Sequence, residues 1–513
     1  MKIGFLSMCL LLICYVFARA QDKAPAYPLI THDAYFSIWS FNDKLNGAPT
    51  KHWTGREQGM LGVLKVDGQC YKFLGAAHQR YLTLLPSSVR QSNQASYTFA
   101  QPTGNWKDAN FDDTAWKKGK APFGDDDEAN TKWTTDHLFY RRVFTINQLS
   151  AAKKYLSLRH DDNVLVYLNG KLIYEKVGWV NEYHHIPIDN GILKKGANTL
   201  AIHVKNTAGG SYLDAGILEE IPSNVSTLDA KQTQVNFNAT STKYTFECGN
   251  VNLDVTFLSP LLLNDINLTA RPISYISYAV KAKDGKTHDV DLFFGASSTI
   301  AVNKDGQPVS AWKTESNDLS ILKTGTVAQP VLQKKGDDIR IDWGYLYVAV
   351  PSQFKPIQFI GSSLSSSSFV KANYAKETEV LGGQQLALNT VIPFGKVTAK
   401  ATEKYMMLGY DDIKSIEYFG EQLLPIWKKG ASQRFEDQLA LANKNYAAIK
   451  DKCVAFDQQL VADATEAGGK QYADLCKMAY RQSIAAHKIV YAPNGDVLFL
   501  SKENFSNGSI NTV

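Results

Sequence analysis

Residues 435–460 read FEDQLALANKNYAAIKDKCVAFDQQL, and this stretch marks the change from β to α structure along the chain. Its apolar side chains recur at alternating spacings of four and three residues, the period of one face of a long α-helix. They are Phe435, Leu439, Ala442, Tyr446, Ile449, Cys453, Phe456 and Leu460. Gly468-Gly469 then interrupts the pattern. The sequence therefore predicts a helix that begins near residue 432 and is broken at these glycines.

A second apolar stripe follows the break. It consists of Tyr472, Leu475, Cys476, Ala479 and Ile484. Two helices joined by a short break predict an antiparallel αα-hairpin. Because a single hairpin cannot bury both of its faces, we expect it to pack against the β-rich region that precedes it.

Cys453 and Cys476 lie on opposite sides of the predicted turn at 465–469. They are not equidistant from it, and the mismatch of about five residues corresponds to roughly 7 Å of helix. A disulfide is compatible with an oxidising compartment, and two separate buried thiols fit the sequence equally well. No cysteine pair has the C-x-x-C spacing of a zinc site, so we predict no metal.

Residues 223–431 are predicted to form a large β-sandwich because short alternating apolar runs are separated by turn signals. The strand candidates are Tyr244–Cys248, Val251–Leu258, Tyr275–Lys281, Val290–Phe294, Ile339–Ile341 and Tyr345–Val350. The serine-rich stretch 362–368 is predicted to be a loop or the start of a helix.

Two further β regions precede this one. Residues 21–90 contain a predicted hairpin around Asp67-Gly68, and residues 91–222 contain a second one around Asn169-Gly170. The other strand candidates in 91–222 are Leu138–Ile146, Lys154–Arg159, Val164–Leu168 and Asn198–Lys205. Several short strands separated by turns predict a β-sandwich. The fold class is therefore mainly β with a C-terminal α part.

Residues 1–20 have the pattern of a secretory signal peptide: Lys2, an apolar run at 3–17 and the small residues of Ala18-Arg19-Ala20. The run is shorter than the ~20 residues that span a bilayer. We therefore expect cleavage after residue 20, a periplasmic or secreted protein and no membrane span. The net charge of +5 is small, and Lys and Arg are scattered, so nucleic acid is not indicated as a partner.

The unit at 91–222 resembles the galactose-binding-like jelly-roll module. The resemblance is carried by Trp106-x4-Phe111-Asp112-Asp113-x2-Trp116, Tyr140-Arg141-Arg142-x-Phe144, Arg159-His160-Asp161-Asp162, Val166-Tyr167-Leu168-Asn169-Gly170 and Asn198-x-Leu200-Ala201. It implies a jelly-roll module of the kind found in secreted glycosidases. In this chain the module is expected to be an insertion, as in Bacteroidetes-type members of the family that the remaining regions resemble.

The remaining regions resemble the glutaminase A family. The matching segments are 28–40 (PLITHDAYFSIWS), 271–277 (RPISYIS), 410–420 (YDDIKSIEYFG), 480–488 (YRQSIAAHK) and 501–509 (SKENFSNGS). The family's catalytic domain is an (α/α)6 barrel of six helical hairpins. The resemblance thus implies hydrolysis of the glutamine side-chain amide without a cofactor. Residues 432–513 supply only the first hairpin, so we expect an incomplete catalytic domain whose other hairpins belong to a separate polypeptide.

Polar residues gather in the stretch 501–513. Glu503 is the candidate general acid or base, and the neighbouring Lys502 and Asn504 are further catalytic candidates. Asn507 and Ser509 are candidates for binding substrate. The alternative is a loop whose polar side chains cap a helix and one another. Because most hydrolytic schemes need a second group beside one carboxylate, we expect Glu503 to be half of a site.

Arg481 and His487 lie on the second predicted helix and are candidates for lining the substrate site. The alternative is a structural, hydrogen-bonded role for both. In the jelly-roll unit, a set of aromatic and amide side chains is a candidate carbohydrate site, with packing as its alternative. The set is Trp179, Asn181, Tyr183 and His184.

Three functions follow from these observations. The first is an exported glutaminase A-type hydrolase, inactive or incomplete as this chain. The second is a glycoside hydrolase-like protein on the six-hairpin scaffold, because fold does not fix substrate. The third is a carbohydrate-binding or assembly protein. A small molecule or a glycan is the expected ligand in each case.

Overall fold

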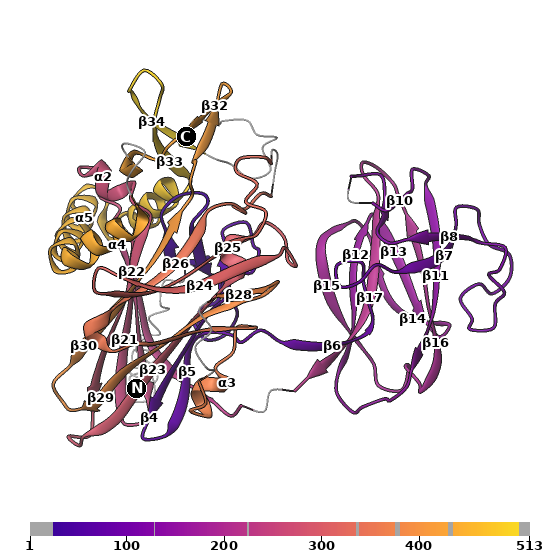
Figure 1. The fold of residues 1–513 in the computed structure, drawn as a ribbon, viewed down its shortest axis with the longest axis horizontal. Coiled ribbons are helices and arrows are strands. Elements are labelled where there is room, and N and C mark those ends of the chain that lie inside the picture. The colour runs from indigo at the N-terminus through magenta and orange to yellow at the C-terminus, as the bar shows by residue number, and fades with distance from the viewer. Residues whose placement is uncertain are drawn as a thin grey trace, which may run out of the picture. The chain divides into compact units, whose positions relative to one another are not determined.

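The computed structural model describes residues 24–127, 129–222, 225–334, 338–374, 380–428 and 434–501. Two compact units are present. The first joins Met1–His78 to Val225–Val513, and the second is Gln79–Asn224. Figure 1 draws both units, each of which is described by itself below.

A nine-stranded antiparallel sheet is the largest element of the first unit. Its strands, in spatial order, are β19 (Lys231–Phe237), β20 (Ser241–Cys248), β21 (Val251–Leu258), β22 (Ile273–Ala282), β30 (Thr402–Asp411), β26 (Tyr345–Pro351), β25 (Leu319–Thr326), β24 (Val309–Ser316) and β28 (Val380–Gly383). Four of the six strands predicted at 223–431 lie in this sheet.

A six-stranded sheet packs against the nine-stranded one. Its strands, in spatial order, are β18 (Leu228–Asp229), β5 (Gln69–Gly75), β4 (Met60–Val66), β23 (His288–Ser297), β29 (Ala387–Val397) and β27 (Ile357–Gly361). The main core contains buried residues of both sheets, among them Leu64, Phe73 and Leu292 on one side and Phe246 and Tyr278 on the other. Each inward face alternates with an outward one, as expected of packed sheets.

The remaining strands of this unit form short sheets. They are β1 (Tyr27–Thr31), β2 (Ser37–Ser40) and β3 (Lys51–His52), the hairpin of β31 (Ile416–Tyr418) with β32 (Glu421–Leu423), and the hairpin of β33 (His487–Tyr491) with β34 (Val497–Ser501). The short helices are α2 (Ile266–Thr269), α3 (Ser367–Val370), η1 (Ser298–Ala301), η2 (Ser352–Phe354) and η3 (Ile426–Lys428).

The long helices α4 (Phe435–Lys444) and α5 (Tyr446–Ala485) cover the outer face of the nine-stranded sheet (Figure 1). The predicted first stripe is confirmed for seven of its eight residues, all but Leu460, since these seven pack on that face. The buried contributors are Phe435, Leu439, Ala442, Ile449 and Cys453 from the helices and Tyr275, Tyr347 and Met407 from the sheet. The hairpin therefore packs on the preceding β region, as expected.

The break predicted between the two helices is confirmed at Gly469, which has φ 78° and ψ −176° inside α5. This conformation is open almost only to glycine. The predicted second stripe is confirmed only at Ile484, which is buried. Tyr472 and Leu475 are 46% and 63% exposed, whereas Met478 and Arg481 are buried. Tyr472, Cys476 and Ala479 instead line an open groove between the arms of α5, which Phe456 also lines.

The second unit consists of two six-stranded sheets around a core of its own. One sheet contains β10 (Thr131–Lys132), β9 (Phe123–Gly124), β17 (Tyr212–Ile221), β12 (Lys154–Asp161) and β15 (Val180–Ile188), with β6 (Arg80–Leu85) also paired to β17. The other contains β14 (Lys171–Lys176), β13 (Asn163–Leu168), β16 (Gly196–Lys205), β11 (His137–Ile146), β7 (Gln94–Thr98) and β8 (Lys117–Lys120). The predicted β-sandwich is thereby confirmed.

Two details differ from the expected organisation. The second unit begins at Gln79 rather than at residue 91, because β6 pairs with β17. Residues 339–341 form no strand. There the backbone is held by Arg340, whose guanidinium donates from Nε and Nη2 to the Asn303 carbonyl at 2.9 and 2.8 Å.

Both predicted hairpin turns are present. Asp67 and Gly68 connect β4 to β5 with φ of 47° and 87°, and Asn169 and Gly170 connect β13 to β14 with φ of 53° and 83°. Two consecutive positive φ angles are the signature of a type I′ turn, which matches the twist of the flanking strands.

Candidate functional site

The predicted catalytic and substrate residues of the terminal stretch lie outside the described residues. They are Lys502, Glu503, Asn504, Asn507 and Ser509. The described chain reaches Ser501, the last residue of β34.

Arg481 lies inside the protein rather than on a surface that substrate reaches. Its side chain is fully buried, and its Nε donates to Thr31 Oγ1 at 2.7 Å while its Nη1 donates to the Asn238 carbonyl at 3.2 Å. Burial lowers the pKa of Arg481 to about 10, against the opposing effect of the nearby Asp457 carboxylate. In the described structure Arg481 therefore ties α5 to β1.

Asp457 anchors the other arm of α5. Its carboxylate accepts from the Thr240 N–H at 2.8 Å and from the hydroxyls of Thr240 and Ser241 at 2.9 Å. Burial raises the pKa of Asp457, and these three donors oppose that effect. Both arms of the hairpin are thus joined to the β-sheets by buried polar contacts. Neither cysteine of the hairpin is in a disulfide, since Cys453 and Cys476 are both free thiols.

His487 begins β33 directly after the last turn of α5. Its ring stacks on Phe499 of β34 with 4.1 Å between the centroids, and its Nδ1 hydrogen-bonds to the Ser483 carbonyl. These contacts hold the imidazole within the β33–β34 hairpin.

The predicted carbohydrate residues lie in β15 or directly before it. Trp179 is 55% exposed just before β15. The Tyr183 hydroxyl donates to Asp214 Oδ2 at 2.5 Å, so this ring is turned inward. His184 is exposed beside Glu182, and Asn181 also lies in β15. Of the side chains that the structure describes in this set, Trp179 presents the largest free surface.

A buried ion cluster that was not predicted lies where α5 passes into β33. The Lys488 ammonium is 2.5 Å from Asp33 Oδ2 and 2.8 Å from Asp412 Oδ2, and all three side chains are buried. Asp33 also accepts from the backbone N–H groups of Tyr35 and Phe36 at 2.8 and 3.0 Å. Burial by itself would lower the pKa of Lys488, but the two carboxylates outweigh it and the pKa is raised.

The two carboxylates of this cluster differ. Burial raises the pKa of Asp412, and Lys488 only partly offsets this. Burial also opposes ionisation of Asp33, but there Lys488 and the backbone donors prevail and the pKa is lowered. The adjoining cavity has a volume of about 10 Å³, which is enough for at most one water molecule. In this conformation the cluster therefore has a structural role, joining β33 to the segments that carry Asp33 and Asp412, and leaves no room for a substrate.

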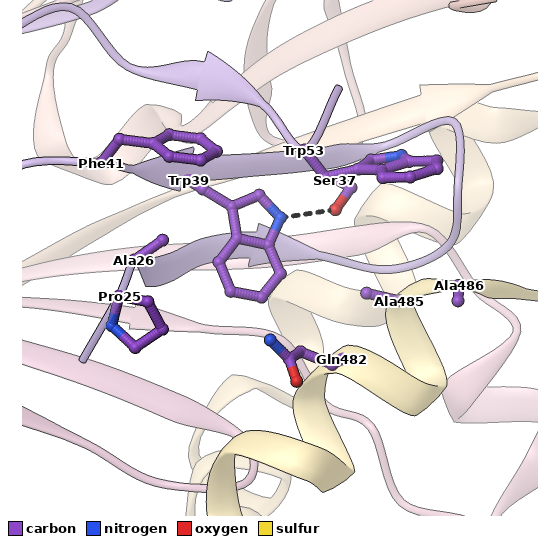
Figure 2. Close-up of a pocket in the computed structure, with 9 residues that line it drawn as sticks. All are labelled: Pro25, Ala26, Ser37, Trp39, Phe41, Trp53, Gln482, Ala485 and Ala486. Carbon is purple, nitrogen blue, oxygen red and sulfur yellow. Dashed lines mark hydrogen bonds between the residues drawn. The ribbon is translucent and has the colours of Figure 1, made fainter. Parts of the chain in front are cut away.

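A larger pocket of about 420 Å³ lies between the β1–β3 sheet and the last turn of α5 (Figure 2). Figure 2 shows the Trp39 ring at its centre, with the Gln482 side chain close by. Trp53 and Phe41 form the rest of its aromatic wall, and Pro25 lies at its edge. None of its lining side chains is ionisable, so the pocket is equipped for binding rather than for acid–base chemistry.

Neither the pocket nor the ion cluster was predicted from the sequence. Lys488 lies 455 residues from Asp33 along the chain, so no local pattern brings the two together. Among the described residues no group of three or more His, Cys, Asp or Glu side chains is placed to hold a metal ion. No described helix is sufficiently long and apolar to traverse a bilayer.

Four family models match parts of the chain. Residues 469–513 match the glutaminase A six helical-hairpin domain, and residues 102–210 match the second all-β domain of β-galactosidase. Residues 7–86 and 240–463 match two domains of unknown function, DUF4964 and DUF5127.

Among solved structures, a Bifidobacterium dentium β-glucuronidase is 13% identical with a TM-score of 0.26, covering 60% of this chain and 48% of that one. Bacteroides uniformis β-glucuronidase 2 is 12% identical with a TM-score of 0.23, covering 49% and 31%. Scores this low support no inference about this chain.

A curated relative, glutaminase A of Aspergillus oryzae, is 25% identical over 298 residues. These residues make up 55% of this chain and 42% of the relative, so the chain spans less than half of that protein's length. This relative and the six helical-hairpin match thus make parts of the chain similar to glutaminase A.

Proposed function

We propose that the chain is part of a hydrolase that releases ammonia from the side-chain amide of glutamine. The observation that carries the proposal is the match of residues 469–513 to the glutaminase A six helical-hairpin domain. The relative named glutaminase A supports it independently, since its similarity extends over 298 residues.

In this proposal the β-sheets act as a rigid base for the helical domain. Asp457, Arg481 and Lys488 join α5 and β33 to the sheets through buried contacts. Ser501 at the end of β34 directly precedes Lys502, Glu503 and Asn504. Catalytic groups need to be held within fractions of an ångström, which a site supported by packed elements achieves better than a free loop.

Glu503 is proposed to transfer protons, with Lys502 and Asn504 steadying the charge that develops on the amide oxygen. Asn507 and Ser509 are proposed to bind the substrate. A second catalytic group is expected from further helical hairpins, whether in the same polypeptide or in a separate one. An open groove of about 690 Å³ between the arms of α5, lined in part by Phe456, Tyr472 and Ala479, supplies an apolar face for such a hairpin.

The test is ammonia release from L-glutamine by the natural full-length protein, compared with its Glu503→Gln variant. Removing a proton-transfer group typically lowers the rate by about 10²–10⁴-fold. Asparagine serves as the control substrate. Release of sugar from aryl glycosides without release of ammonia from glutamine would replace this proposal with the glycoside-hydrolase alternative.

Carbohydrate binding by the second unit is a second candidate function. It is favoured by the match of residues 102–210 to a β-galactosidase domain and by Trp179, which is 55% exposed. Titration of the protein with lactose should then give binding that Trp179→Ala abolishes. Binding that survives this substitution would contradict a site at Trp179.

We also propose that the protein is exported to the periplasm or secreted, with cleavage after Ala20. The pattern of Lys2, an apolar run and Ala18-Arg19-Ala20 supports this. N-terminal sequencing of the protein from its native cells tests it, since a first residue other than Gln21 would contradict the cleavage site.

A further inference from the structure

The aromatic pocket of Figure 2 lies in the first unit and has no role in the proposed amide hydrolysis. Its volume of about 420 Å³ lies within the usual range of small-molecule sites, about 300–1,000 Å³. Three aromatic side chains line it: Trp39 is nearly buried, Trp53 is half-buried and Phe41 is 48% exposed. The pocket thus has a fixed floor and an accessible rim.

Both indole N–H groups are already occupied. The Trp39 Nε1 donates to Ser37 Oγ at 2.8 Å, and the Trp53 Nε1 donates to the Ala34 carbonyl at 2.9 Å. These bonds orient the rings and leave only their faces for a ligand. A proline-rich peptide is therefore disfavoured, because the aromatic grooves that bind such peptides must also satisfy the peptide carbonyls.

Gln482 supplies the pocket's free polar group. Its side chain is exposed and hydrogen-bonds to none of the residues that the structure describes. One amide offers two donors and an acceptor, which suits a pair of neighbouring hydroxyl groups. A charged ligand is disfavoured because none of the lining residues is ionisable, and a buried charge without a partner is costly.

We propose that this pocket binds a neutral pyranose sugar. The apolar face of the sugar ring stacks on Trp53 and Phe41 above the floor formed by Trp39, since C–H groups are attracted to the negative face of an aromatic ring. The Gln482 amide binds two adjacent hydroxyls. The inference does not depend on the proposed amide hydrolysis.

Isothermal titration of the natural full-length protein with cellobiose, lactose, maltose and glucuronate tests this site. At least one neutral disaccharide should bind and glucuronate should not. Trp53→Ala should weaken binding by about tenfold or more, the effect of losing one stacking face. Gln482→Met keeps the shape of the side chain but removes its hydrogen bonds, and should weaken binding by about fivefold. Phe419→Ala is the control and should leave this binding unchanged, because the Phe419 side chain is 92% exposed and does not line the pocket.

Gln482→Met keeps the test decisive if Trp53→Ala fails to fold. The proposal is overturned if none of the three disaccharides binds, or if glucuronate binds as tightly as they do. It is also overturned if binding is unchanged in Gln482→Met and disappears in Trp179→Ala. Titration does not measure ammonia release, so each of these results leaves the proposed hydrolysis to its own assay.

Discussion

Replacing Lys488 by Met is expected to destabilise the first unit strongly, because it leaves Asp33 and Asp412 buried without their cation. The ammonium lies 2.5 and 2.8 Å from the two carboxylates, and the three side chains are 7%, 7% and 1% exposed. Removing one partner of a buried ion pair typically costs about 3–5 kcal/mol of unfolding free energy. We expect Lys488→Met to fall in this range at pH 7.

A matched control isolates the effect of burial. Lys396 and Asp289 form an ion pair of nearly the same length, 2.6 Å, but their side chains are 70% and 63% exposed. Exposed pairs of this kind contribute at most about 1 kcal/mol. Lys396→Met should therefore have little effect on stability, although it removes the same kind of group.

Urea unfolding followed by circular dichroism at 222 nm measures both variants, since α4 and α5 lie in the first unit and dominate its helical signal. The pH dependence adds a second test. Because the pKa of Lys488 is raised, its contribution to the free energy of unfolding is fully present below about pH 10.4, the usual lysine pKa. The lowered pKa of Asp33 means that its contribution is lost only as the pH falls through that lowered value.

Without Lys488, both carboxyl groups become easier to protonate inside the protein. The deficit of Lys488→Met should therefore shrink as the pH is lowered from 7 toward 4.5. An equal loss of stability in Lys488→Met and Lys396→Met would contradict a strong stabilising effect of the buried ion pairs. A loss of stability in Lys488→Met that does not change with pH would contradict it as well.

Three further predictions concern the helical hairpin. Gly469→Ala should cost about 1–3 kcal/mol in thermal unfolding, because φ 78° with ψ −176° is strained for a residue with a Cβ; an unchanged melting temperature would contradict the break. Leu439→Ala should lower the free energy of unfolding by about 2–5 kcal/mol because Leu439 is fully buried. Leu475→Ala should change it by no more than about 0.5 kcal/mol because Leu475 is 63% exposed. Similar losses for the two variants would show that the wrong helix face was assigned to the core. Asp457→Asn should lower stability more at pH 4.5 than at pH 7. Burial raises the pKa of Asp457, so the wild-type protein gains stability as this carboxyl group is protonated in acid, whereas the Asn variant does not; a loss that is equal at both pH values would contradict a raised pKa of Asp457.

Local signals in the sequence were sufficient for much of the fold. Asp67-Gly68 and Asn169-Gly170 each determine a turn through their own backbone preferences, so the hairpins around them were predictable. The stripe that begins at Phe435 faces the nine-stranded sheet as its period indicated. In the stripe after Gly469 only Ile484 is buried against the β region, because Tyr472, Cys476 and Ala479 face the open groove between the arms of α5.

The ion cluster had no local signal. Asp33, Asp412 and Lys488 are brought together by three different elements, and their spacing along the chain follows no period. The pocket is similar, since Gln482 comes from α5 while its aromatic wall comes from the N-terminal strands. Sites of this kind depend on how sheets and helices pack, which a single sequence does not specify.

The decisive measurement is ammonia release from L-glutamine by the natural full-length protein and by its Glu503→Gln variant. We expect release by the wild type, at least about 100-fold slower release by Glu503→Gln, and folding of both proteins to the same stability. Wild-type protein that releases no ammonia from glutamine, or a Glu503→Gln variant that releases it at the wild-type rate, would contradict the proposed function.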